Sequence, residues 1–325
     1  RKEFTQNLPY GFSKYKEYST KAHKYTIYKN DYPLSIGYTY DKYIDNEEYE
    51  KLSAIEKQQV MLESAVLDTK NVKSLEKGDI KSVSDKIKYG TVTVKDTDGV
   101  IVKEDRIRSK KEESTLTLSY EKKKGYEAYL MLDGVTTKKP RIKAKISTDD
   151  MEKNIVLRNN DLTYALGRDS YLINLGYSDT SESEDVIFTI PIKAKINYSD
   201  VKVCYVPMDD YVSQIEERNE ESLQNVLTDK NNEVSGNVTL SSDKVMVFSI
   251  PYSSGWKAYV DGKETSVFRA NTMYMGINLT KGSHKVVLRY NSPGLHLGMM
   301  ASAAGIIIWI LLAVVSKKKK QKGNQ

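Results

Sequence analysis

The strongest constraint on this chain is a run of twenty residues without a charge, from Leu297 to Ser316, which ends directly before four consecutive lysines. A helix of about 20 apolar residues spans the hydrocarbon core of a bilayer, which is about 30 Å thick. This length exceeds that of the short apolar runs buried in soluble proteins. The run therefore predicts one transmembrane helix over residues 297–316, followed by a basic tail over residues 317–325.

The distribution of basic residues around this helix predicts its orientation. Five lysines occur in the tail, whereas only Lys285 and Arg289 lie in the fifteen residues before the helix. Positive residues close to a span favour the cytoplasmic side. We therefore expect a cytoplasmic tail and an extracytoplasmic region over residues 1–296.

The start of the chain adds a second expectation about topology. Arg1 is preceded by no initiator methionine, and no signal peptide follows it. Because a region outside the cytoplasm must be exported, we expect an export signal or membrane span upstream of Arg1.

The net charge of +6 comes mostly from the tail, because without its five lysines 45 basic residues balance 44 acidic ones. This balance does not indicate a nucleic acid as a partner, since such a partner needs basic residues gathered on one face. The single cysteine, Cys204, lies in the apolar run VKVCYV, and we expect it to be a small core residue. No intramolecular disulfide can form, and a region of this size can bury a core without one.

Most of the exported region has the alternating pattern of β-strands. Polar turns separate the apolar segments, which recur every 10 to 15 residues or so. The expected strands cover residues 90–94, 100–107, 114–121, 126–134, 141–148, 153–159, 171–178, 185–192 and 201–206. This spacing predicts a mainly β protein with an antiparallel β-sandwich or jelly roll rather than an alternating parallel fold.

Two helices are expected to interrupt the strands. The first covers residues 53–68, where Ser53 and Glu56 have the spacing of a capping box. Two short strands, at 24–30 and 34–41, precede it. The second helix covers residues 209–227 and is amphipathic.

A final β block lies directly before the transmembrane helix. Five strands are expected, at 245–252, 255–260, 263–268, 273–279 and 284–290. Turn signals occur at Asp261-Gly262 and at Lys281-Gly282. The predicted segments of the chain are therefore 1–79, 80–206, 207–230, 231–296, 297–316 and 317–325.

Residues typical of catalysis or metal binding are sparse. The three histidines, His23, His284 and His296, are far apart in the sequence, and no hydrolase, phosphate-loop or dinucleotide motif occurs. Residues 96–99 (DTDG) lack a third oxygen ligand of a Ca²⁺ loop and its final glutamate. We expect no catalytic residue, no metal and no cofactor in this chain.

Two regions carry a resemblance to a known family. The last β block contains Pro251-Tyr252, Gly255-Trp256, Asp261-Gly262 and the Lys281-Gly282 turn, and Tyr290, Pro293 and the transmembrane helix follow. A second region, YKNDYPLSIGYTYD at 28–41, leads into the expected first helix. This pattern resembles the C-terminal end of the YfhO family of bacterial multi-pass membrane proteins. Pro251, Gly255, Asp261, Gly262 and Gly282 would be its structural positions.

The resemblance implies a membrane glycosyltransferase of the GT-C architecture in the bacterial plasma membrane. Such proteins add sugars from polyprenyl-phosphate donors to cell-wall polymers, notably of the teichoic-acid type. Their catalytic acid lies in an early extracytoplasmic loop, which is outside this chain. The partners that this resemblance implies are the bilayer, the upstream transmembrane core and a cell-wall polymer or glycan.

The segment GWKAYVDG offers residues for contact with such a polymer. Alternation along a strand places Trp256 with Ala258 and Val260 on a core-facing side, and Lys257 with Tyr259 on the other. Tyr259 and Lys257 are therefore the better candidates, and Trp256 and Tyr252 are further ones. Two functions remain open: an exported module of a membrane glycosyltransferase-like protein, or a surface-binding or structural β-module without an enzyme, anchored by one helix.

Overall fold

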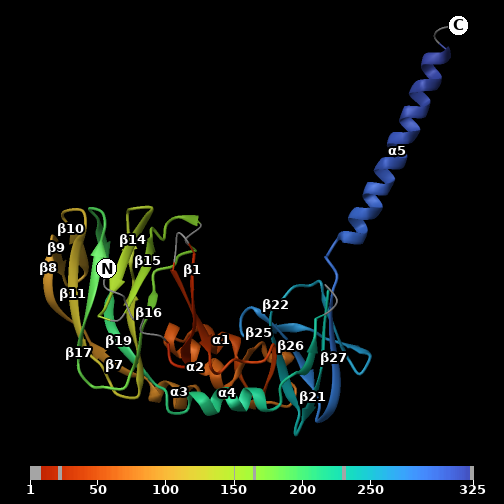
Figure 1. Cartoon of the computed structure of the whole chain (residues 1–325). Helices are drawn as coiled ribbons and strands as arrows, with labels where there is room; N and C mark the ends of the chain where they lie inside the picture. The colour runs from red at the N-terminus through yellow and green to blue at the C-terminus, as the bar shows by residue number, and fades with distance from the viewer. Residues whose placement is uncertain (1–8, 21–23, 150, 164–165, 229–231, 323–325) are drawn as a thin grey trace. The chain divides into compact units, whose positions relative to one another are not determined.

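The computed structural model describes residues 9–20, 24–149, 151–163, 166–228 and 232–322, with side chains as far as Val314. The chain forms two compact units and passes between them several times (Figure 1). Unit 1 comprises residues 1–34, 42–64 and 76–220. Unit 2 comprises residues 35–41, 65–75 and 221–325.

Unit 1 is built mainly from three antiparallel sheets. The first has the order β15-β14-β17-β11-β8, with bounds Glu152–Arg158, Arg141–Ser147, Ser183–Ile190, Ser114–Glu121 and Thr93–Asp98. The second has the order β16-β12-β19-β7, with bounds Tyr171–Ser178, Tyr126–Asp133, Asp200–Pro207 and Lys88–Thr91. The third has the order β13-β18-β10-β9, with bounds Thr136–Thr137, Lys195–Asn197, Arg106–Ser109 and Val100–Lys103.

These sheets share one hydrophobic core, which confirms the predicted antiparallel β-sandwich. Burial alternates along the strands, most regularly in β11, where every second residue from Ser114 to Tyr120 is buried. All three sheets contribute to the core, for example through Leu116, Leu130 and Ile196. Alternation of this kind is what turns one face of each sheet inward.

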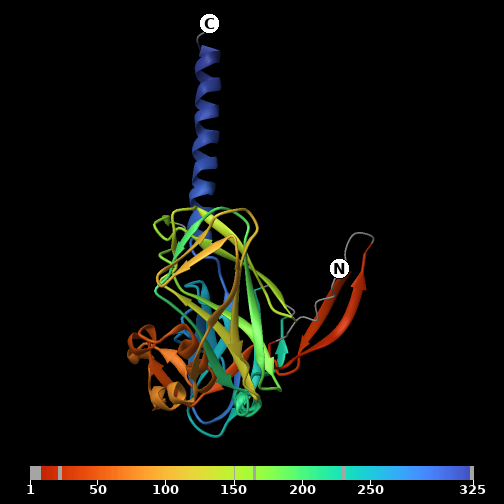
Figure 2. The ribbon, with the colours of Figure 1, turned by 90° about the vertical axis from the view of Figure 1, so that its left-hand side faces the viewer.

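The remaining elements of unit 1 are short. They are the hairpin of β1 (Phe12–Ser19) and β2 (Lys24–Asn30), the strands β4 (Lys42–Asp45) and β6 (Glu76–Lys77), and the helices α1 (Asn46–Glu50), α2 (Ala54–Glu63), α3 (Ile80–Lys86) and α4 (Tyr211–Glu220). The capping box expected at the start of α2 is present, because Ser53 and Glu56 bond each other's backbone N–H groups. Figure 2 shows the hairpin standing away from the sandwich of its unit.

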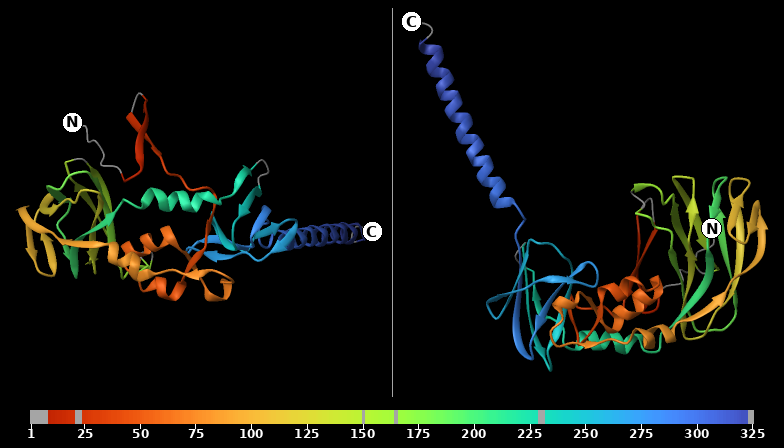
Figure 3. Two further views of the ribbon diagram at one scale, coloured as in Figure 1. Left: turned by 90° about the horizontal axis from the view of Figure 1, so that it is seen from below. Right: turned by 180° about the vertical axis from the view of Figure 1, so that it is seen from behind.

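Unit 2 is a smaller arrangement of two antiparallel sheets (Figure 3). One has the order β20-β21-β27-β23-β24, with bounds Gln224–Leu227, Glu233–Leu240, Gly282–Tyr290, Trp256–Val260 and Lys263–Thr265. The other contains β3-β22-β26-β25-β5, with bounds Gly37–Tyr40, Lys244–Pro251, Tyr274–Leu279, Phe268–Ala270 and Ala65–Leu67. A short 3₁₀ helix at Thr69–Asn71 follows β5. Both sheets contribute to one core around Phe248, Ile277 and Leu288.

The predicted helix at 53–68 is too long. Helix α2 ends at Glu63, Ser64 is extended with φ −138° and ψ 143°, and Ala65–Leu67 is the strand β5. The Val66 N–H donates to Asn271 Oδ1 at 2.8 Å, and the Val66 carbonyl accepts from the Asn271 N–H at 2.9 Å. These hydrogen bonds take the place of the backbone bonds that a continued helix would make. A short, fully buried apolar run suits a strand as well as a helix, so its composition did not reveal this end.

The predicted helix at 209–227 also ends early. Helix α4 stops at Glu220, and Leu223, which lies within the predicted range, is buried in the core of unit 2. The Leu223 N–H donates to the Gly37 carbonyl at 2.8 Å, and β20 begins at the next residue.

Three predicted strands are interrupted. The segment 100–107 is the hairpin β9–β10, with Lys103 opposite Arg106 and a turn at Glu104-Asp105 that lacks glycine. Residues 90–94 divide between β7 and β8, and residues 263–268 divide between β24 and β25. The pattern of alternation does not show such breaks, because a turn without glycine or proline leaves it almost unchanged.

The C-terminal helix α5 extends over Leu295–Lys322. Its segment Leu295–Val314 is long and apolar enough to cross a membrane, and none of it is buried. It agrees with the single apolar helix predicted from the sequence. Residues 291–294 alone separate it from β27, so unit 2 is joined to this helix by a short link.

The cysteine prediction is confirmed by the structure of unit 1. Cys204 is fully buried in β19, and its Sγ lies 3.8 Å from the Met131 sulfur. Burial raises the pKa of the Cys204 thiol to about 11. The thiol is therefore protonated and unreactive near neutral pH.

Candidate functional site

The outer face of the third sheet of unit 1 carries two adjoining hollows lined by basic side chains. The larger has a volume of about 770 Å³ and the smaller about 470 Å³, and Arg108 and Lys195 line both. We call the two together the basic groove. Its eight basic side chains are Lys103, Arg106, Arg108, Lys110, Lys138, Lys139, Lys193 and Lys195.

The alternation of the strands explains why these side chains gather on one face. In the segment around β18, Ala194 and Ile196 are buried, whereas Lys193 and Lys195 are exposed. Strand β10 repeats this pattern, with Ser109 buried between exposed basic residues. The apolar side chains anchor the sheet to the core of the sandwich, so the lysines and arginines are left on the outer side.

Register then places positive charges directly opposite one another. Arg108 faces Lys195 across β10 and β18, and Arg106 faces Lys103 across β10 and β9. Like charges opposite each other destabilise a sheet. A bound anion would remove this repulsion, which makes the face suited to an anionic ligand.

The groove contains almost no compensating negative charge. Its lining residues include no aspartate or glutamate among the residues that the structure describes. Arg106 pairs with Asp105 in the adjacent turn at 3.1 Å. The described ion pairs include none with the other seven basic side chains.

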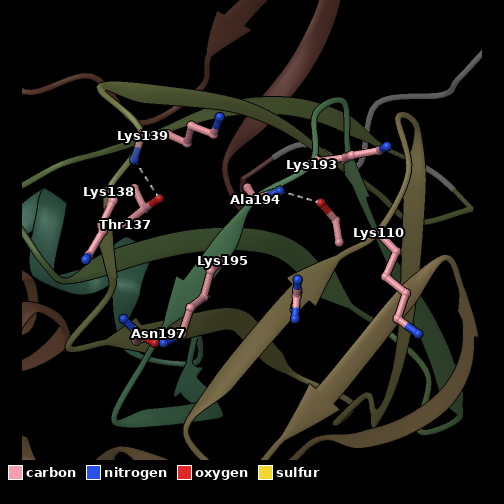
Figure 4. Close-up of a pocket in the computed structure, with 10 residues that line it drawn as sticks. Lys110, Thr137, Lys138, Lys139, Lys193, Ala194, Lys195 and Asn197 are labelled. Atoms are coloured by element: carbon pink, nitrogen blue, oxygen red, sulfur yellow. Dashed lines mark hydrogen bonds between the residues drawn. The ribbon is translucent and has the colours of Figure 1, made fainter.

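Hydrogen bonds hold the segments around the larger hollow together (Figure 4). The Ser109 hydroxyl donates to the Ile192 carbonyl at 2.6 Å and accepts from the Ala194 N–H at 2.9 Å. The Lys139 N–H donates to Thr137 Oγ1 at 3.2 Å. The backbone under the lysines is thus fixed, while their ammonium groups are free to rearrange around a ligand.

The residues proposed from the sequence for polymer contact belong to unit 2, whereas the basic groove belongs to unit 1. Trp256 is partly buried against the unit 2 core and its ring centroid lies 5.1 Å from that of Tyr290. Lys257 is exposed and pairs with Glu264 at 3.0 Å. Tyr259 lies on the same side, with the Arg289 guanidinium 5.3 Å from its ring centroid. The predicted division of this strand into a core side and an outer side is confirmed.

The remaining proposed residues occupy turns and strand ends. Tyr252 is half-exposed, with the Arg269 guanidinium 5.5 Å from its ring centroid. Pro251 ends β22, and Gly282 begins β27. A Cβ at Gly255 would lie 2.4 Å from the Asn291 carbonyl oxygen, so only glycine fits there. No sugar-binding constellation links Tyr252 to Tyr259 in the described contacts, and their role stays a prediction.

The Asp261-Gly262 turn holds a histidine. Both residues have positive φ, 52° and 81°, as a tight hairpin turn requires. His284 Nδ1 lies 2.7 Å from Asp261 Oδ2, and its Nε2 lies 2.9 Å from the Thr280 carbonyl oxygen. Two acceptors favour the doubly protonated ring, and the bond to Asp261 raises the pKa of His284 above its usual value.

We expect the substitution His284→Gln to make the stability of unit 2 less dependent on pH. Because the pKa of His284 is raised in the folded state, its protonated ring stabilises the fold fully below pH 6.5. This stabilisation is lost as the pH rises through the folded-state pKa of His284. The bond also lowers the pKa of Asp261, so the stabilisation weakens again as the pH falls towards that value. Denaturant unfolding at pH 6 and pH 9 should show a variant deficit of about 0.5–1 kcal/mol at pH 6 only. A deficit equal at both pH values would contradict the assignment.

The side chains that commonly ligate metals do not gather in the residues that the structure describes. No group of three or more histidine, cysteine, aspartate or glutamate side chains is placed to hold a metal ion there. The basic groove was missed by the sequence analysis, because each of its segments alone resembles a solvated strand face. The alternations Arg106-Ile107-Arg108 and Lys193-Ala194-Lys195 were its only local signals.

Comparison with solved structures gives only remote likenesses. An arabinofuranosyltransferase AftD from Mycobacteria is 16% identical, with 53% of this chain and 14% of that chain covered, at a TM-score of 0.23. A Paenibacillus cycloisomaltooligosaccharide glucanotransferase is 6% identical, with 62% and 44% covered, at a TM-score of 0.24. Scores this low do not define a shared fold.

Comparison of sequences gives a clearer result. The protein YfhO of Bacillus subtilis (strain 168), described as uncharacterized, is 23% identical over 338 residues. The alignment covers 98% of this chain, which spans about a third (34%) of the length of that relative. The family model described as bacterial membrane protein YfhO matches residues 1–302. The match over nearly the whole chain, together with the apolar helix α5, shows that this chain belongs to the YfhO family of bacterial membrane proteins.

Proposed function

We propose that this chain is the extracytoplasmic C-terminal module of a membrane glycosyltransferase-like protein, and that its basic groove binds the polymer to be glycosylated. The polymer would be an anionic cell-wall polymer of the teichoic-acid type, and the sugar would come from a polyprenyl-phosphate donor. The observation that carries the proposal is the basic groove itself, with eight basic side chains and no carboxylate in its described lining.

The chemistry of the groove suits phosphodiesters. Arg106 and Arg108 offer planar guanidinium groups, which bind phosphate oxygens in a bidentate manner. The lysines supply flexible point charges, which can follow phosphates at varying positions along a mobile polymer. An open, polar hollow favours a chain that passes through it over a small ligand that must be enclosed.

The position of the membrane helix supports the same proposal. Unit 2 is joined to α5 by residues 291–294, so unit 2 would be tethered close to the bilayer surface. A lipid-linked sugar donor is held at that surface. With the lysine-rich tail in the cytoplasm, the whole β region would lie on the outer side, where cell-wall polymers are found. Catalysis would belong to a part of the protein outside this chain.

The alternative is a surface-binding module that has no enzyme attached. The sequence of the parent gene discriminates between the two functions. A long multi-pass region upstream of Arg1 supports the transferase, and a signal peptide directly before Arg1 supports the anchored module. Polymer binding in the groove is compatible with both, so the binding experiment below tests the groove rather than the catalytic assignment.

Binding to poly(glycerol phosphate) is expected to weaken strongly with salt. Neutralising about three or four phosphates of a flexible polyanion gives a slope of roughly −0.7 per phosphate in log K against log salt, or about a 30-fold loss between 50 and 200 mM salt. The full chain in lipid nanodiscs and a fluorescently labelled polymer would provide the measurement. Dextran, a neutral polymer, is the control and should not compete. Salt-independent binding, or equal competition by dextran, would contradict the proposal.

A further inference from the structure

In the part of the chain that the structure describes, no third strand pairs with the β1–β2 hairpin of unit 1. Its two strands pair from Phe12↔Asn30 to Ser19↔Lys24 and form a sheet of their own. Figure 2 shows it projecting from its unit. A two-stranded hairpin is at best marginally stable alone in water. A surface that covers one of its faces would stabilise it.

The register sorts the large apolar side chains onto one face. Tyr18 lies opposite Tyr25, and Ile27 lies two residues further along the same side of β2. The register shifts between Lys14, which lies on the opposite side, and Lys16, and the extra residue, Tyr15, lies with Lys16 on the Ile27 side. The exposed fractions are 70% for Tyr15, 56% for Tyr18, 51% for Tyr25 and 46% for Ile27. We call this the tyrosine face.

The opposite face is mostly polar and internally paired, and its large side chains are Tyr28, which is half-buried, and Phe12, which is 40% exposed. Glu17 forms ion pairs with Lys14 at 2.5 Å and with Lys24 at 3.2 Å. Thr26 lies opposite Glu17 on this side. The two faces therefore differ in chemistry, and only the tyrosine face presents a row of large, exposed apolar groups.

The hairpin is also strongly basic. Residues 12–30 contain five lysines and one glutamate, a net charge of +4. Lys16 and Lys29 lie on the tyrosine face, opposite Ile27 and Ser13, and are exposed. Neither has an ion pair among the described residues. An apolar face with lysines at its margin complements a surface that is both apolar and negatively charged.

We propose that the tyrosine face docks on the headgroup region of an anionic lipid bilayer. Tyrosine prefers this depth, because its ring enters the acyl boundary while its hydroxyl stays hydrated. Lysines near an anionic surface strengthen the attraction to it. The same chain carries a helix that is long and apolar enough to cross a membrane, so a bilayer is a surface at which this chain would be held. This proposal does not depend on the function of the basic groove.

A fluorescent reporter on the hairpin tests this proposal. In the full chain, Ile27→Cys carries an environment-sensitive dye on the tyrosine face, and Thr26→Cys carries it on the polar face as the matched control. Cys204 is fully buried, so it does not compete for the label. The protein is reconstituted into phosphatidylcholine vesicles with or without phosphatidylglycerol, each with brominated acyl chains as quencher.

We expect the dye at position 27 to shift to the blue and to be quenched at least about twofold more than the dye at position 26 in the anionic vesicles. The double substitution Lys16→Glu and Lys29→Glu should remove the difference. An unquenched dye at position 27 overturns the proposal, and a blue shift without quenching would show that protein covers the face instead. Equal quenching at both positions overturns the assignment of the face.

Discussion

Replacing both Arg108 and Lys195 by glutamate is expected to lower the affinity of the full chain for poly(glycerol phosphate) by about 100-fold. Both residues line both hollows and face each other across β10 and β18. A hydrogen bond to a charged group contributes about 1.5–3 kcal/mol, and about 1.4 kcal/mol corresponds to a tenfold change in affinity. Fluorescence anisotropy with labelled polymer measures the effect.

The matched control changes the same number of charges outside the groove. Arg141 and Lys143 are exposed on β14 and do not line either hollow, so the double substitution Arg141→Glu and Lys143→Glu should change the affinity by less than about fivefold. The single substitution Arg108→Glu adds a further test. It places a carboxylate opposite Lys195 and should stabilise the sheet by about 0.2–1 kcal/mol while it weakens binding. Equal losses in the groove and control variants would refute a specific site.

The substitution Ile146→Ala is expected to cost about 2–5 kcal/mol of the free energy of unfolding of unit 1, because it leaves a cavity in the core. Ile146 is fully buried in β14 and belongs to the core that all three sheets share. A domain has a total stability of about 5–15 kcal/mol, so this loss is a large part of it. Denaturant unfolding followed by circular dichroism measures the change.

A second isoleucine on the same sheet gives the control. Ile187 of β17 lies opposite Ser147 and is 37% exposed. Its replacement by alanine removes the same atoms but leaves no cavity, so the cost should be about 1 kcal/mol or less. Similar costs at both positions would mean that the assigned inner and outer faces of the sandwich are wrong.

Much of the fold could be predicted because local pattern and final structure agree. Strands β11 and β16 have the bounds expected from alternation alone, since each has a core face and an outer face. The Asp261-Gly262 hairpin followed from the need for positive φ at both residues. The apolar helix was predictable from length and composition.

The helix ends were not predictable, because distant residues decide them. Ala65–Leu67 could continue a helix by composition, but its hydrogen bonds go to Asn271, more than 200 residues away in the sequence. Leu223 likewise enters a core built largely from residues after it. Local periodicity contains no information about such partners, and tertiary packing overrides it.

The basic groove escaped the sequence analysis for a related reason. Its sheet has the order β13-β18-β10-β9, so strands nearly 100 residues apart become neighbours. The overall charge balance of residues 1–296 hides the local concentration of basic side chains, because the acidic residues lie elsewhere. A charged face becomes visible only when the register is known.

The most direct test of the central claim is the sugar content of the cell-wall polymer in a strain of the source bacterium whose own gene is replaced. The ratio of sugar to phosphate in purified polymer would be measured in four strains. They carry the unchanged gene, a deletion, the double variant Arg108→Glu and Lys195→Glu, or the double control Arg141→Glu and Lys143→Glu. The amount of each protein in the membrane would be checked. We predict that the deletion and the groove variant lose most of the sugar, while the control keeps it. Normal glycosylation by the groove variant at normal protein levels, or by the deletion strain, would contradict the account.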